Sequence, residues 1–306
     1  MDTTARVLVH LFLLLAFAPL LQGVIVKTKA FFAGRLGAPL LQPYYDLAKL
    51  WRKGCVFSRA TSWIFHAGPV AGLAIPPLAC LLLPFGRLPA PISFEGDMIL
   101  FLYLFGLSRF LVVAAALDTG SSFEGMGGAR EVTFSCLTEP TVLFCLLVLA
   151  RLGGEPSLGA LLGAHLPSLW HSSAGFSLAL SMVCLFVVLL AENSRIPFDD
   201  PTTHLELTMI HEVMVLDHGG PELGMILYGA AMKLMVLGAL LLDVAPLPPT
   251  GQPALDALVF LAGMVALAVL VGIVESTLAR LRLTRVPQVL IGASLLSIFA
   301  LVLVLR

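Results

Sequence analysis

Charged side chains are scarce in this sequence. They make up 12% of its 306 residues, whereas hydrophobic residues make up 58%. Soluble domains carry roughly 25% charged residues, so the composition excludes a soluble globular class. The formal net charge of −1 does not point to any class of partner, and we expect no nucleic-acid partner. The composition predicts a polytopic membrane protein surrounded by the lipid bilayer.

Sequence motifs of catalytic and metal sites are also missing. The chain has no HExxH, no GxSxG and no Rossmann glycine fingerprint, and no GK[ST] follows its glycine-rich segment. We therefore predict no catalytic residue, no metal site and no bound cofactor in this chain. If the protein serves a redox system, its redox centres are expected on other chains. The cysteines follow no CxxC or other metal-ligand spacing; they are Cys55, Cys80, Cys136, Cys145 and Cys184.

Long apolar runs dominate the rest of the chain, and eight of them approach the length of about 20 residues that a bilayer requires. The sequence therefore predicts an all-α fold with eight transmembrane helices in a single integral-membrane domain, 1–306. The fourth run is short, and its helix could begin before Pro140. The first run could be a signal peptide, but a retained span is favoured because no small-residue cleavage pattern follows it. The predicted helices are Val7–Val26, His66–Phe85, Asp97–Leu117, Pro140–Leu152, Ala174–Ala191, Leu223–Asp243, Leu255–Ala279 and Pro287–Leu305.

Basic residues are unevenly distributed between the connecting loops. Most of the 18 lysines and arginines fall in loops that would share one face of the membrane. Loops rich in lysine and arginine stay in the cytoplasm, so both termini are expected outside. The predicted cytoplasmic loops are about 27–65, 118–139, 192–222 and 280–286.

The loop from Glu192 to Glu222 is exceptionally dense in carboxylates and imidazoles, and we call it the acidic stretch. Ionisable groups next to membrane spans indicate a proton relay, an ion path or a docking surface. Asp200-Pro201 is typical of a helix start, and Gly219-Gly220-Pro221 is typical of a helix end. We therefore predict a short helix between them.

The first cytoplasmic loop contains a mixed apolar and basic segment at residues 40–53. Leu47, Leu50 and Trp51 would form one face of a helix, and Lys49 and Arg52 would lie off it. This pattern predicts an amphipathic helix on the cytoplasmic membrane surface. Its role is open between a plain membrane-hugging connection and a platform for a peripheral subunit.

Four ionisable residues fall inside or beside apolar runs: Arg109, Glu139, Lys233 and Glu275. Charge at that depth is costly, so Arg109 and Lys233 are expected to face the interior of the helix bundle beside acidic partners. Glu139 is either an acid at membrane depth, where low dielectric would let it exchange protons near neutral pH, or a helix-end carboxylate among the headgroups.

Several motifs then match a known family. The segment Glu192–Asp199 resembles the E-x-N-R-x-P-F-D signature of the membrane-anchor subunit of respiratory complex I. The continuation 200–212 is more similar to the equivalent subunit of formate hydrogenlyase and of group 4 membrane-bound nickel–iron hydrogenases. Further segments that resemble this family, in chain order, are 34–37, 41–50, 129–131, 139–140 and 274–282.

The resemblance implies an eight-helix anchor without a redox centre, beneath a hydrogenase-like peripheral arm. Its cytoplasmic loops would dock the arm, and its acids would link electron transfer to proton or sodium movement. The implied proton path and junction are Glu139, Glu192, Asp199, Asp200, Glu206, Glu212 and Glu275. Structural ion pairing is assigned to Arg109, Arg130, Arg195 and Lys233. The implied docking surface includes Arg35, Tyr44, Asp46, Lys49, His204 and His211.

The implied partners are the large and small hydrogenase subunits, an iron–sulfur protein and antiporter-like membrane subunits. Iron–sulfur clusters and a nickel–iron centre are expected on those partners, in the inner membrane of a prokaryote. The runner-up function is the quinone-site subunit of an NADH:quinone oxidoreductase-like complex, although the sequence departs from that branch after Asp199. A stand-alone transporter is a more remote alternative, because no internal repeat is evident.

Overall fold

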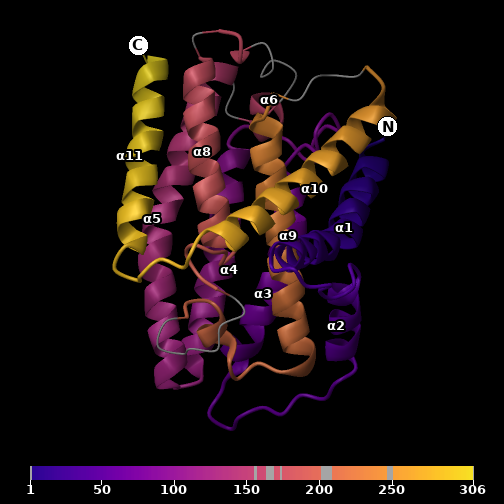
Figure 1. Ribbon diagram of the computed structural model, residues 1–306, viewed down its shortest axis with the longest axis vertical. Helices are drawn as coiled ribbons and strands as arrows, with labels where there is room; N and C mark the ends of the chain where they lie inside the picture. Colours follow the sequence, from indigo (N-terminus) through magenta and orange to yellow (C-terminus); the bar gives the residue numbers. More distant parts are fainter. Residues whose placement is uncertain are drawn as a thin grey trace.

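The computed structural model describes residues 2–154, 157–162, 169–172, 174–200, 209–246 and 251–305. Eight of the helices in these ranges are long and apolar enough to cross a bilayer. The predicted all-α, multi-pass membrane fold is therefore confirmed (Figure 1). The eight helices are α1 (Thr3–Phe32), α3 (Trp63–Cys80), α4 (Asp97–Asp118), α5 (Ser122–Gly153), α8 (Gly175–Glu192), α9 (Gly220–Val244), α10 (Pro253–Thr277) and α11 (Val286–Leu305).

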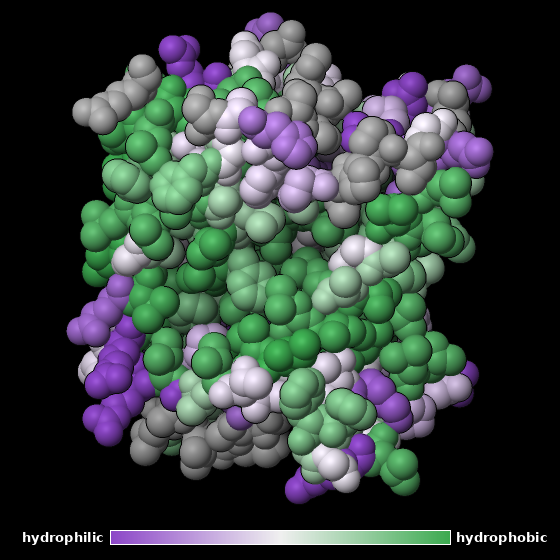
Figure 2. Space-filling model, turned by 45° about the horizontal axis from the view of Figure 1, so that its top comes forward, coloured by the Kyte–Doolittle hydropathy of each residue, from purple (hydrophilic) through white to green (hydrophobic). Residues whose placement is uncertain are grey.

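The spanning helices form one bundle with both chain ends on the same side (Figure 1). Helix α3 packs between α4 and α9, α11 packs on α5 and α8, and the strongly tilted α10 packs on α1. In the space-filling view, apolar side chains form a broad band, and hydrophilic side chains gather toward the two ends (Figure 2). This distribution is the one expected of a protein whose middle faces lipid chains.

Small residues bring some of these helices into close contact. A Cβ atom added to Gly229 of α9 would overlap the carbonyl group of Gly72 in α3. Close backbone approach through glycine is common between membrane helices, where packing rather than water exclusion drives association. The crossing of α3 and α9 places Lys233, one turn beyond Gly229, in the interior of the bundle.

The fourth spanning helix differs from its prediction. The loop expected at 118–139 is mostly helical, because α5 begins at Ser122 and contains Pro140 in its interior. A proline removes one helical hydrogen bond, here the one to the Cys136 carbonyl, and membrane helices tolerate this loss inside a packed bundle. The carbonyl oxygen of Leu137 accepts hydrogen bonds from the hydroxyls of Thr141 and Ser294, each at 3.1 Å. Glu131 and Glu139 therefore lie on one continuous helix.

The predicted amphipathic helix is present as α2 (Gln42–Trp51). It packs against α9 and α1. Pro19 lacks an N–H group, which leaves carbonyls of the preceding turn of α1 without helical partners. The hydroxyl of Tyr44 donates to the Ala16 carbonyl oxygen, and the hydroxyl of Tyr228 donates to that of Leu15 at 2.8 Å. Helix α2 is thus joined to the part of α1 that precedes Pro19.

The acidic stretch is only partly helical in the described ranges. Residues 201–208, which hold His204 and Glu206, lie outside them. The remainder contains one 3-10 turn, η1 (Glu212–Val215). In its described part, the predicted helix does not extend to Gly219-Gly220-Pro221, because η1 ends at Val215; α9 begins at Gly220 and carries Pro221 in its first turn. Proline suits the first turn of a helix, because the N–H groups there have no helical acceptor and a missing N–H loses no hydrogen bond.

Candidate functional site

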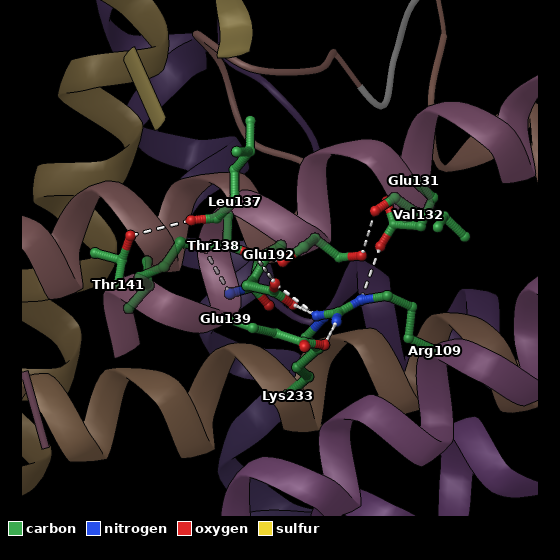
Figure 3. A network of polar contacts seen from close by, with 12 residues as sticks. Arg109, Glu131, Val132, Leu137, Thr138, Glu139, Thr141, Glu192 and Lys233 are labelled. Atoms are coloured by element: carbon green, nitrogen blue, oxygen red, sulfur yellow. Dashed lines mark hydrogen bonds and ion pairs between the residues drawn. The ribbon is translucent and has the colours of Figure 1, made fainter. Parts of the chain in front are cut away.

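Arg109 stands at the centre of a buried charge cluster, at the middle of α4 (Figure 3). Its Nη2 donates to both carboxylate oxygens of Glu192, at 2.6 and 2.7 Å, and its Nη1 donates to Glu139. Its Nε lies 3.3 Å from Oε1 of Glu131. Only 9% of the Arg109 side chain is exposed. One guanidinium therefore joins three carboxylates, two from α5 and one from the end of α8.

Glu192 also pairs with a second cation and with a hydroxyl. Lys233 of α9 donates to Oε2 at 2.7 Å, and Thr138 of α5 donates to Oε1 at 2.7 Å. Buried charges are tolerated when they are paired and hydrogen-bonded in this way. We call Arg109, Glu131, Glu139, Glu192 and Lys233 the Arg109 cluster. The structure thus places acidic partners beside both mid-membrane cations.

A second buried cluster surrounds Arg195 in the acidic stretch. Its Nη1 lies 3.3 Å from Oε1 of Glu275 at the end of α10, and its Nη2 donates to the side-chain oxygen of Gln22. Lys29 of α1 pairs with the other Glu275 oxygen at 2.8 Å. These four residues, the Arg195 cluster, hold the acidic stretch against α1 and α10.

Asp199 organises the backbone of the acidic stretch. Its Oδ2 accepts hydrogen bonds from the amides of Ile210 and His211, both at 3.1 Å. Its Oδ1 accepts one from Nη2 of Arg280 at 2.8 Å, and another from the Asp200 amide at 2.9 Å. These contacts fix the position of His211 relative to the Arg109 cluster.

His211 connects the acidic stretch to the Arg109 cluster. Its Nδ1 lies 3.1 Å from Oε2 of Glu131, whose other oxygen faces Arg109. Burial alone would lower the pKa of His211, but the Glu131 carboxylate outweighs it and raises the pKa above the ordinary value. An imidazole with a raised pKa next to a buried acid can hold and release a proton near neutral pH. The line from His211 through Glu131, Arg109 and Glu192 to Lys233 is continuous.

The raised pKa of His211 gives a pH-dependent contribution to folding stability. That contribution is fully present below the unfolded-state pKa of about 6.5 and is lost as the pH rises through the higher folded-state pKa. We expect the thermal midpoint of the detergent-purified protein to fall less steeply above pH 6.5 in His211→Gln than in the wild type. Thermal unfolding curves between about pH 6 and pH 9 test this. Equal slopes in both proteins would contradict the His211–Glu131 pairing.

A third polar cluster lies where α3 and α9 begin. Glu222 pairs with Nδ1 of His66 and, at 3.2 Å, with Nδ1 of His218. His218 also stacks on the ring of Phe65, with 3.9 Å between centroids. This cluster ties the end of the acidic stretch to the start of α3.

A cavity of about 350 Å³ lies between the first two clusters. Arg109, Glu192 and Lys233 line one part of it, and Arg195 and Gln22 line another. The remaining walls are mostly apolar and come from α1, α2, α3, α4, η1 and α9; they include Pro19, Leu47, Pro76, Phe105, Met214 and Leu227. The cavity is therefore an apolar chamber whose polar groups belong mainly to the two ion-pair networks.

The other residues singled out in the sequence are more dispersed. Arg130 donates from Nη1 to the Met209 carbonyl oxygen at 2.8 Å. Glu212 and Asp46 line the cavity, and Asp46 also accepts a hydrogen bond from Gln42. Arg35 and Lys49 are exposed, whereas the Tyr44 hydroxyl is used within the chain. Of the predicted docking residues, Asp46 and His211 thus line the cavity together with acidic residues, whereas Arg35, Tyr44 and Lys49 do not line it.

Several residues of these networks were not assigned as site residues from the sequence. They include Glu131, Glu222, Lys29, Gln22, Thr138 and Arg280. Glu131 had a detectable signal, because Glu131, Ser135 and Thr138 recur at helical spacing on the buried face of α5. In the described ranges, no group of three or more His, Cys, Asp or Glu residues is placed to hold a metal ion.

Comparisons with known proteins agree on one family. The family model described as NADH dehydrogenase matches residues 5–305. Formate hydrogenlyase subunit 4 of Escherichia coli strain K12 is 29% identical over 294 residues, which cover 92% of each chain. Hydrogenase-4 component C of the same organism is 30% identical over 285 residues, covering 90% of this chain and 88% of the relative. An NADH-quinone oxidoreductase subunit of Syntrophotalea carbinolica is 29% identical over 217 residues, covering 66% of this chain and 62% of the relative.

Among solved structures, a chain of the membrane-bound sulfane sulfur reductase, an archaeal respiratory membrane complex, has a similar fold. The TM-score is 0.83 at 19% sequence identity, and the match covers 99% of this chain and 100% of that one. At this level of identity the likeness shows the fold alone. It supports the eight-helix arrangement.

Proposed function

The chain belongs to the family whose model is described as NADH dehydrogenase, and from this premise we propose that it anchors a membrane-bound hydrogenase or formate hydrogenlyase. Its relatives include subunits of formate hydrogenlyase, of hydrogenase-4 and of NADH-quinone oxidoreductase. It is therefore a membrane subunit of the complex I-like type. The two relatives that it matches along most of its length carry hydrogenase or hydrogenlyase names, which favours the hydrogenase branch.

The observation that carries the proposal is the continuous line of buried ionisable groups from His211 to Lys233. It starts in the acidic stretch and ends in the interior of the bundle. Its members are held by short ion pairs and hydrogen bonds, so a change of charge at one end alters the pairing along the line. Such a line can couple an event at the acidic stretch to ion movement in the membrane.

A charge balance indicates how the coupling would work. Counted as ion pairs, the Arg109 cluster contains three carboxylates and two cations, so it carries one negative charge when His211 is neutral. Protonation of His211 brings the combined charge to zero. Electron transfer in a peripheral arm would move the acidic stretch or change its charge. Either change would alter the protonation of His211. The Arg109 cluster would then release or attract a positive charge.

The rest of the complex follows from this proposal. The partners are the large and small hydrogenase subunits, an iron–sulfur protein and antiporter-like membrane subunits. The iron–sulfur clusters and the nickel–iron centre belong to those partners, and this chain has no catalytic residue of its own. The complex lies in the inner membrane of a prokaryote, with both termini of this chain outside and the acidic stretch in the cytoplasm.

A second candidate function is that of a quinone-site subunit, and the cavity supports it. Its volume of about 350 Å³ lies within the range of sites for small molecules, and its walls combine apolar surface with a few convergent polar groups. The relation to a subunit of NADH-quinone oxidoreductase points the same way. Reduction of an added short-chain quinone by the purified complex would identify this function.

Purification from native membranes tests the proposal directly. An affinity-tagged copy of the chain, extracted in mild detergent, should co-purify with soluble subunits that contain iron and nickel. Mass spectrometry and metal analysis of the purified sample give the composition. Iron without nickel, together with quinone reduction, would favour the second candidate. A chain that purifies alone and transports a substrate after reconstitution would contradict both.

A further inference from the structure

Glu139 differs from the other carboxylates of the Arg109 cluster in its exposure. Its side chain is 53% exposed, whereas those of Glu131 and Glu192 are almost completely buried. The exposed part opens to the outside of the bundle beside α4 and α5, which flank it. The cluster therefore reaches the lateral surface of the protein at this carboxylate.

The helix geometry places Glu139 at the depth of the lipid chains. It lies 14 residues before Gly153, where α5 ends on the side of the chain termini. At about 1.5 Å per residue this distance is roughly 21 Å, which is less than the ~30 Å thickness of a hydrocarbon core. Glu139 therefore lies well inside the span of α5, at a depth where an exposed side chain is expected to meet lipid chains.

One oxygen of Glu139 has no partner among the residues that the structure describes. Oε1 accepts from Arg109, and no described residue donates to Oε2. Lipid chains cannot donate a hydrogen bond, so a carboxylate oxygen facing them is costly. The Arg109 cluster also lacks one positive charge whenever His211 is neutral. Both features call for a cation outside this chain.

The surface around Glu139 suits a packed helix. Tyr103 and Phe110 of α4 are 73% and 69% exposed, and Leu107 lies between them at three- and four-residue spacing. Gly106 presents no side chain and lies beside Glu139. A Cβ atom added to Gly106 would be 3.8 Å from Oε1 of Glu139. Apolar side chains that flank a small residue and a polar group are typical of helix–helix contacts in membranes.

We propose that the α4/α5 face centred on Glu139 binds a membrane-spanning helix of another subunit, and that a lysine, arginine or histidine of this helix pairs with Oε2 of Glu139. The inference rests on the proposed function, because it assumes a complex with further membrane subunits. It adds where such a subunit contacts this chain and which chemistry it brings. The partner cation would pair with Glu139, whereas His211 pairs with Glu131 at another part of the cluster.

Photo-cross-linking tests the contact. A photoreactive phenylalanine analogue replaces Tyr103 or Phe110 in the complete complex in native membranes. The control places the same analogue at Phe12 of α1, which is 70% exposed. It gives the background cross-linking yield of an exposed aromatic residue on a different spanning helix. Tyr103 and Phe110 should cross-link to a membrane-embedded subunit well above the Phe12 yield. Cross-linking no greater than at Phe12, in samples that retain the soluble subunits, would overturn the inference; samples without soluble subunits would contradict the proposed function instead.

Substitution of Glu139 tests the charge. Glu139→Leu should lower recovery of the neighbouring membrane subunit about tenfold or more, because truncating one partner of a hydrogen-bonded charge pair has effects of this size. Glu139→Gln keeps the shape and should give a smaller loss. Glu95→Leu, at an exposed acid near the start of α4, is the matched control and should leave recovery unchanged. Unchanged recovery of the neighbouring membrane subunit in Glu139→Leu would refute the pairing.

Discussion

Replacing Arg109 by leucine is expected to destabilise the folded protein by ~3–5 kcal/mol, which is the usual cost of removing one partner of a buried ion pair. Among the described residues, its guanidinium is the only group that contacts Glu131, Glu139 and Glu192 together. Without it, Glu139 loses its cation, while Lys233 remains beside Glu192 and His211 remains beside Glu131. We expect little folded protein in the membrane and no turnover of the complex. The thermal midpoint in detergent and the yield of assembled complex measure the effect.

Two variants separate this effect from a general loss of positive charge. Arg151→Leu removes an exposed arginine at the end of α5 and should change the midpoint little. Arg109→Lys keeps the charge but lacks the planar fork that reaches several carboxylates, so its midpoint should lie between the two. Equal midpoints for Arg109→Leu and Arg151→Leu would show that the Arg109 cluster does not hold the bundle together.

Replacing Arg195 by alanine is expected to have the second largest effect, on assembly and turnover. Arg195 is buried, and it joins the acidic stretch to Glu275 and Gln22 on two other helices. Its loss leaves Lys29 as the cation that pairs with the buried Glu275. The cost should be well above the ~0–1 kcal/mol of a surface ion pair. Co-purification of the soluble subunits and turnover in native membranes measure it.

Arg282→Ala is the matched control for Arg195→Ala. Arg282 is an exposed arginine in the segment between α10 and α11. Its removal should leave assembly and turnover close to wild type. Normal assembly and turnover in Arg195→Ala itself would mean that the Arg195 cluster does not position the acidic stretch.

The sequence was sufficient for the spanning helices because their apolar runs leave few alternatives in a membrane. It was insufficient for the start of α5, because the apolar run begins at Pro140 and shows only that the helix could begin earlier. In the bundle, α5 continues through Pro140, and the hydroxyl of Ser294 in α11 donates to the nearby Leu137 carbonyl. The contact with Ser294 depends on α11, which is distant in sequence and cannot be inferred from the local pattern.

The same limit explains which site residues were missed. The sequence singled out Arg109 and Lys233, because isolated cations inside apolar runs are conspicuous. Glu131 follows a glycine-rich segment that was expected to be a loop, and only the extension of α5 brings it to Arg109. The sequence also did not show that Glu139 pairs with Arg109. Sequence spacing shows neighbours on one helix but not which helices meet.

The most direct test of the account is the membrane potential formed per electron in vesicles that carry Glu192→Gln. This change removes one negative charge from the centre of the Arg109 cluster, which then has two carboxylates and two cations and is neutral without a proton on His211. We therefore expect the complex to assemble and turn over while it no longer builds a membrane potential, whether protons or sodium ions move. Glu95→Gln, at an exposed acid, should behave as wild type. Wild-type potential per electron in Glu192→Gln would contradict the claim that this cluster couples electron transfer to ion movement.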